Sequence, residues 1–182
     1  MSGYYDGTNM NGLLAAMMKP TRRKVFVSYH HGGDQAYYTE FSRIFHDQYE
    51  TVFDNSLERA YDSDDVNYVM RRIRENHIHG TSCTVILCGS QTRWRKYVDW
   101  EIKAALDKQH GLVAVQLPTL PVGLDGRVHV PDRLLDNISS GYAVWMHWSQ
   151  LTLHSLNQAV ETTINREKWR ISNARDMRQR NG

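Results

Sequence analysis

The chain has 182 residues, a length typical of one domain, and its 41% hydrophobic and 23% charged side chains exclude a disordered tail and a membrane-embedded protein. Its 22 basic and 20 acidic side chains give a net charge of only +2. No apolar stretch approaches the roughly 20 residues of a membrane span, and residues 13–18 form too short an apolar run for a signal peptide. We therefore expect a cytoplasmic protein without membrane contact.

Residues 1–23 are predicted to form an N-terminal extension, and residues 24–165 a single domain in which strands and helices alternate. Asp34 is the expected N-cap of the first helix, after a loop, and acidic residues 62–65 are expected to cap the second. Five strands are predicted, at residues 25–29, 51–53, 83–88, 112–117 and 142–148. The predicted helices begin at residue 34, cover residues 66–73, 92–108 and 151–168, and include a helical turn near residue 134.

This alternation predicts an α/β fold with right-handed crossovers and a parallel sheet. Residues 83–88 are apolar on both faces, as in a central strand, and their two cysteines point to opposite faces as buried, reduced thiols. The simplest arrangement is a three-layer, flavodoxin-like fold with strand order 2-1-3-4-5 and helices on both faces. A ligand is then expected beyond the carboxyl ends of the strands, at residues 29–34 and 89–94.

Missing motifs exclude several nucleotide-binding classes that use such sheets. The sequence has no Gly-x-x-x-x-Gly-Lys loop and no Gly-x-Gly-x-x-Gly after a strand. The acidic residues of a phospho-receiver and the phosphate loop of a flavodoxin are also missing after the first and third strands. The residues that follow these two strands, here called the mouth of the site, are polar and aromatic and include His30.

The helix predicted over residues 92–108 holds one carboxylate near its buried side. At about 100° per residue, Glu101 lies beside the inward-facing stripe of Val98 and Ile102, whereas Asp99 faces away. Glu101 is thus a candidate site residue. The alternative is a boundary residue that reaches water or pairs with an arginine.

The histidines and tryptophans have structural alternatives too. No set of zinc ligands is evident, so no metal is expected, while His30 at the mouth could contact a ligand. Trp94 could stack on a ring of a ligand, although tryptophans more often pack in cores. The basic C-terminal tail, residues 166–182, carries six basic and two acidic side chains. It could hold nucleic acid or an acidic partner, but a solvated helix end is the simpler interpretation, so we do not expect nucleic acid to be the main partner.

Two sequence blocks resemble a known family. The first comprises residues 25–30 with Asp34, and the second runs from Thr81 through residues 83–90 and Thr92 to residues 95–102. Together they resemble the TIR-like domains of the Thoeris ThsB type, a bacterial anti-phage family, over residues 24–165.

This resemblance implies a flavodoxin-like fold and an enzyme that cleaves NAD. NAD is then the substrate rather than a cofactor; nicotinamide is released, and the ADP-ribose part becomes a signal that activates a separate effector during phage infection. Assembly into a homo-oligomer is also possible. By its match to the family's motif, Glu101 is the catalytic residue. The resemblance places the remaining site residues near the nucleotide: Ser28, Tyr29, His30, Ser90 and Trp94.

The implied chemistry is coherent, because breaking the bond between nicotinamide and ribose develops an oxocarbenium-like cation that a fixed carboxylate can stabilise. Nicotinamide leaves as a neutral molecule, so one glutamate can suffice. Two alternatives remain: a non-catalytic module that binds partner proteins, and a sensor that binds a nucleotide without cutting it.

Overall fold

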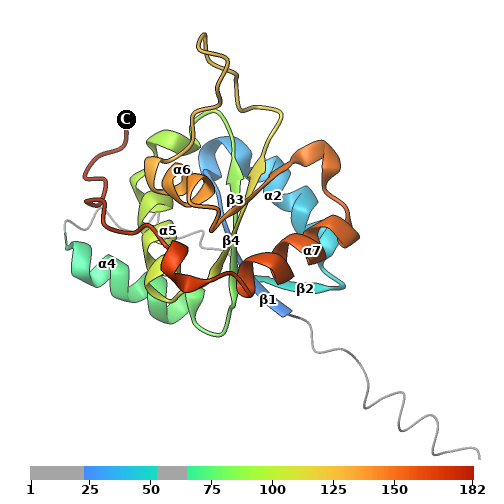
Figure 1. Cartoon of the computed structure of the whole chain (residues 1–182), viewed down its shortest axis with the longest axis horizontal. Helices are drawn as coiled ribbons and strands as arrows, with labels where there is room; N and C mark the ends of the chain where they lie inside the picture. The colour runs from blue at the N-terminus through green and yellow to red at the C-terminus, as the bar shows by residue number, and fades with distance from the viewer. Residues whose placement is uncertain (1–22, 53–64) are drawn as a thin grey trace, which may run out of the picture.

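The computed structural model describes residues 23–52 and 65–182, which fold into three layers with a parallel sheet in the middle (Figure 1). The five strands are β1 (Arg23–Ser28), β2 (Tyr49–Val52), β3 (Cys83–Cys88), β4 (Gly111–Gln116) and β5 (Val144–His147). The helices are α2 (His31–Phe45), α4 (Val66–Arg72) continued by a π-helical turn (Ile73–Ile78), α5 (Lys96–Asp107), α6 (Asp132–Ser139) and α7 (Leu153–Ile164).

The sheet has the predicted order, β2-β1-β3-β4-β5, and all four strand pairs are parallel. Helices α2 and α7 cover one face, and α4, α5 and α6 cover the other (Figure 1). The predicted α/β fold class is therefore confirmed. The chain reverses direction between β1 and β3, so the carboxyl ends of these two strands are the expected ligand-binding edge.

Alternation along the central strand builds a separate core on each face. Cys83, Val85 and Leu87 join the cluster under α2 and α7, whereas Ile86 and Cys88 join the cluster under α5. All five side chains are fully buried. The two cysteines are free and lie on opposite faces, as predicted from their spacing.

Two helix starts differ from the prediction. Helix α2 begins at His31 with His30 as N-cap, so Asp34 lies within the first turn rather than capping it. The helix predicted over residues 92–108 is interrupted: a short 3-10 turn, Thr92–Trp94, precedes α5, and Arg95 between them has extended dihedrals (φ −88°, ψ 115°). Both corrections lie at the carboxyl edge of the sheet, where loop contacts outweigh helix periodicity.

Other predicted elements need smaller adjustments. Helix α6 forms two turns where a single turn near residue 134 was expected, and Asp65 caps α4 by accepting a hydrogen bond from the Tyr68 amide. The extension to residue 22, Phe53 of the second predicted strand and acidic residues 62–64 lie outside the described residues. Within the described residues, no helix is both long and apolar enough to cross a membrane.

The basic C-terminal tail is not the end of a helix. Helix α7 stops at Ile164, well before the predicted residue 168, and the chain then crosses the α6 and α5 side of the domain (Figure 1). Arg166 donates to the carbonyl of Gly141, and Arg175 pairs with Asp136. These two basic side chains of the tail are thus bonded to α6 or to the turn that follows it.

Candidate functional site

A buried carboxylate lies at the carboxyl end of β1. The Ser28 hydroxyl donates to Oε2 of Glu101 over 2.5 Å, and the two residues are only 1% and 6% exposed. Ser28 is the last residue of β1, and Glu101 lies in the second turn of α5, which begins just beyond β3. The predicted candidate is therefore buried against the sheet and does not reach into bulk water.

Strand alternation explains why these two side chains meet. Ser28 shares the face of β1 with Phe26, which packs in the cluster under α5. On α5, Ile102 and Ala105 fill the same cluster, and Glu101 lies beside that apolar stripe. A serine at the end of the strand thus faces a glutamate at the edge of the helix, one turn from the helix start.

Tyr29 faces the opposite side of the sheet. Its ring stacks on Tyr38 of α2, with centroids 4.7 Å apart and planes 4° from parallel, and its hydroxyl donates to Gln35 over 2.9 Å. His30 is the N-cap residue of α2 without a side-chain cap and is 8% exposed, and its imidazole packs closely over Gly32 and Gly33. Tyr29 therefore packs on the far side of the sheet from the Ser28–Glu101 pair, and His30 follows it directly before α2.

Ser90 and Trp94 come together in a small pocket of about 170 Å³ at the same edge. Both are exposed, Trp94 by 40%, and the Arg93 guanidinium lies 4.8 Å from the Trp94 ring centroid. Glu101 is not among the residues that line this pocket. Arg93 lines the pocket too, and the other lining residues come from the loop after β4: Leu120, Pro121, Gly123 and His129.

A second buried carboxylate, Asp34, ties three loops together and was missed as a site residue. It is 2% exposed, and the hydroxyls of Thr92 and Thr119 lie 3.4 Å from its two oxygens. Gly89 is required beside it, since a Cβ there would lie 2.1 Å from Oδ1 of Asp34. The available signal was a glycine directly after the central strand, which marks a close approach of another group. Asp34 thus fixes the loop that carries Ser90 and Trp94.

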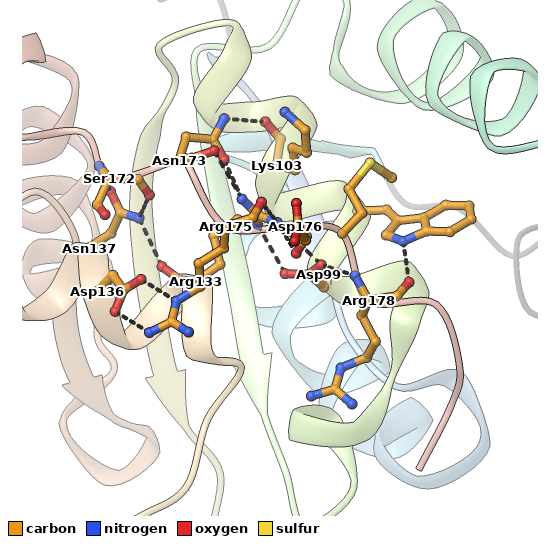
Figure 2. A network of polar contacts seen from close by, with 12 residues as sticks. Asp99, Lys103, Arg133, Asp136, Asn137, Ser172, Asn173, Arg175, Asp176 and Arg178 are labelled. Atoms are coloured by element: carbon orange, nitrogen blue, oxygen red, sulfur yellow. Dashed lines mark hydrogen bonds and ion pairs between the residues drawn. The ribbon is translucent and has the colours of Figure 1, made fainter.

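Asp99 was expected to face away from the buried stripe, and it is nevertheless 7% exposed. It pairs with the fully buried Arg133 of α6, Nε to Oδ1 3.0 Å, beneath the C-terminal tail (Figure 2). The amphipathic pattern of α5 could not reveal this burial, because the covering segment lies about 80 residues further along the chain.

Other reactive side chains are poorly placed for catalysis. Burial raises the pKa of the Cys83 thiol to about 12 and raises that of Cys88 as well, so both remain protonated at neutral pH. Among residues 23–52 and 65–182, no group of three or more His, Cys, Asp or Glu side chains is arranged to hold a metal ion. What the edge of the sheet offers is a desolvated carboxylate beside a hydroxyl, which can stabilise a developing cation.

Residues 26–121 match the family model described as Thoeris protein ThsB, TIR-like domain. Among solved structures, the TIR domains of the activated Roq1 resistosome, which recognises the pathogen effector XopQ, are similar at 15% identity and a TM-score of 0.37. That match covers 53% of this chain and 58% of the other, and no curated protein matches. Because the family model covers more than half of the chain, including the end of β1, β3 and all of α5, the chain belongs to the Thoeris ThsB family of TIR-like domains.

Proposed function

We propose that this domain cleaves NAD between nicotinamide and ribose, and that its ADP-ribose-derived product is the signal for a separate effector in anti-phage defence. The observation that carries the proposal is the buried Glu101 carboxylate facing Ser28 at the carboxyl end of β1. This is the edge at which parallel sheets of this order bind ligands. Membership of the ThsB family is consistent with nucleotide chemistry at the same edge.

In the proposed reaction the glycosidic C–N bond breaks, and its electron pair leaves with the nicotinamide nitrogen. The pyridinium becomes neutral nicotinamide, and positive charge develops on the ribose ring. Glu101 stabilises that cation, or holds the ribose hydroxyls so that the ring distorts toward it. Water then adds to the anomeric carbon and loses a proton, or a nucleophile of the same molecule adds and closes a ring.

Access to Glu101 requires a rearrangement. The carboxylate is 6% exposed, so the Ser28 hydroxyl must turn away and the loops after β1 and β3 must part before a ribose can reach it. The pocket beside Ser90 and Trp94, at about 170 Å³, is smaller than the roughly 300–1,000 Å³ of typical ligand sites, so it holds only part of a dinucleotide. Assembly with a second copy is one way to open and complete the site.

The test is a comparison of Glu101→Gln with the wild type. Glutamine has the same shape and can still bond to Ser28, so the thermal midpoint should stay near that of the wild type while nicotinamide release is lost. Glu40→Gln is the matched control, because Glu40 is half-exposed on α2 and pairs with Arg43 one turn away. Chromatography of NAD incubated with purified protein, artificially oligomerised protein and lysate of infected cells provides the readout.

Wild-type turnover in Glu101→Gln would overturn the assignment of this residue. Absence of NAD loss in all three preparations would favour a non-catalytic module instead. One feature supports that alternative: the loop between β4 and α6 projects from the domain (Figure 1), and Val122 and Leu124 on it are 62% and fully exposed. Saturable NAD binding without product would identify a nucleotide sensor.

A further inference from the structure

Residues 172–182, the C-terminal strap, have no regular secondary structure and lie across α6 and α5 (Figure 2). The strap begins beside Asn137 of α6, whose side-chain amide donates to the Ser172 carbonyl over 2.7 Å and whose Oδ1 accepts from the Ser172 amide. It ends beside Trp94, immediately before α5. The path therefore connects α6 with the start of α5, the helix that carries Glu101.

A buried arginine anchors the strap. All five N–H donors of the Arg133 guanidinium have acceptors: Nε bonds to Asp99, and the two terminal nitrogens bond to carbonyl and side-chain oxygens of the strap. The strap acceptors are the Asn173 carbonyl and Oδ1 and the carbonyls of Arg175 and Asp176, at 2.8–3.2 Å. Because Arg133 is fully buried, the strap is part of the folded domain.

The two residues that precede Glu101 hold the middle of the strap. The backbone amide of Arg178 donates to Oδ2 of Asp99 over 2.9 Å, and the Arg178 carbonyl accepts from the indole Nε1 of Trp100 over 2.8 Å. The amide and the carbonyl of Arg178 are thus bonded to consecutive side chains of α5 (Figure 2). Glu101, the next residue, is bonded to Ser28 on the side of the sheet.

The end of the strap caps α5 and supports Trp94. The N-cap residue of α5, Arg95, makes no side-chain cap, and Oδ1 of Asn181 accepts from the Lys96 amide over 2.9 Å in its place. The Gly182 amide donates to the Trp94 carbonyl over 3.1 Å, and Gly182 packs on the indole, where a Cβ would lie 3.0 Å from the ring. A residue 85 positions away therefore performs the role of a local N-cap.

We propose that the C-terminal strap is a positioning element of the Glu101 site: it sets the start of α5 and the place of Trp94, so that Glu101 meets the substrate at a fixed position. The inference rests on the proposed function. The strap holds α5 from the outside while Ser28 meets it from the sheet, so the rotation of the first two turns is determined from both sides. Without the Asn181 cap, the Lys96 amide loses its acceptor and the first turn of α5 frays.

Asn181→Ala in the full chain is the decisive variant. We expect its kcat for nicotinamide release to fall about tenfold with little change in thermal midpoint, since misplacement by about 1 Å can cost about 100-fold. Asn181→Asp should restore turnover, because aspartate is an equally good N-cap acceptor. Gln179→Ala is the matched control within the strap, as the Gln179 amide bonds only to the nearby Met177 carbonyl among the described contacts.

Hydrogen exchange separates this inference from the proposed function. Exchange of the Lys96 amide should be about tenfold faster in Asn181→Ala and unchanged in Asn181→Asp and Gln179→Ala, whether or not any NAD is cleaved. Faster exchange together with reduced kcat supports the inference. Unchanged exchange overturns it, and so does faster exchange with wild-type kcat. If the wild type itself cleaves no NAD, the proposed function fails, and the exchange result alone decides whether the strap positions α5.

Discussion

Asp99 and Glu101 lie two residues apart on α5 and are equally buried, yet they are held differently. Asp99 faces the strap and is bonded to the guanidinium of Arg133 and the backbone of Arg178. Glu101 faces the sheet and accepts a hydrogen bond from the Ser28 hydroxyl. A guanidinium is a permanent cation in a rigid fork, whereas a hydroxyl rotates about one bond and can release its partner to a ligand. One helix thus carries a structural carboxylate on its outer side and a candidate reactive carboxylate on its inner side.

Replacing Arg133, the partner of Asp99, should lower the free energy of unfolding most. Removing one partner of a buried ion pair leaves the other charge uncompensated, so Arg133→Ala should lower the free energy of unfolding by about 3–5 kcal/mol. The loss is large because the strap carbonyls and Asp99 lose their donors at the same time. Urea denaturation followed by far-UV circular dichroism measures it.

The control for this variant is Arg175→Ala. Arg175 of the same strap is half-exposed and pairs with Asp136 of α6 at the surface, so its loss should cost less than about 1 kcal/mol. Equal effects of the two substitutions would mean that burial of the Asp99 pair contributes nothing beyond a surface ion pair. The structural role assigned to Asp99 would then be wrong.

His110, which lies before β4 at the edge of the sheet opposite the Ser28–Glu101 pair, makes the folded domain sensitive to acid. Burial lowers the pKa of His110 to about 4, and the charges of Lys108 and Lys168 add to this effect. The unfolded chain binds the proton near the ordinary pKa of about 6.5, so the folded state loses stability as pH falls from about 6.5 to 4. His110→Gln should lose less stability over this window, by at most about 3 kcal/mol.

The measurement is urea denaturation of both proteins at pH 7 and pH 4.5. Glutamine at residue 110 retains a group that can bond to the Thr81 hydroxyl, which lies 3.4 Å from Nδ1 of His110. Equal loss of stability in wild type and variant would show that folding does not lower the pKa of His110. Any residual acid sensitivity of the variant belongs to the carboxylates and other groups.

Local sequence pattern predicted the parts of the molecule that depend on periodicity. Residues 83–88 are apolar on both faces and form the central strand with the predicted bounds. The strand order follows from the alternation of strands and helices, and helical spacing placed Glu101 beside the buried stripe. These features are encoded within a few neighbouring residues, and pattern analysis could therefore find them.

The rest depends on contacts between distant residues. Asp34 was predicted as the N-cap that follows a loop, whereas α2 already starts at His31 and the carboxylate bonds to Thr92 and Thr119. The burial of Arg133 depends on strap residues about 40 positions away. A charged tail in the sequence suggests a solvated segment, and only the fold brings its backbone carbonyls to a guanidinium.

Two buried hydroxyls on the α5 side of the sheet should differ in how their removal changes the free energy of unfolding. The Ser28 hydroxyl is bonded to Glu101, whereas the Thr84 hydroxyl on β3, in the strand pair with Phe26, is buried without a partner among the described residues. Ser28→Ala should therefore cost about 1.5 kcal/mol of unfolding free energy, because a charged acceptor loses its donor. Thr84→Val keeps the shape and removes an unsatisfied polar group, so it should add about 0.5–1 kcal/mol. The two substitutions act on neighbouring strands with opposite sign, and chemical denaturation of both resolves the difference. A loss of stability in Thr84→Val would mean that its hydroxyl has a partner, such as a buried water, and the two hydroxyls would then be alike.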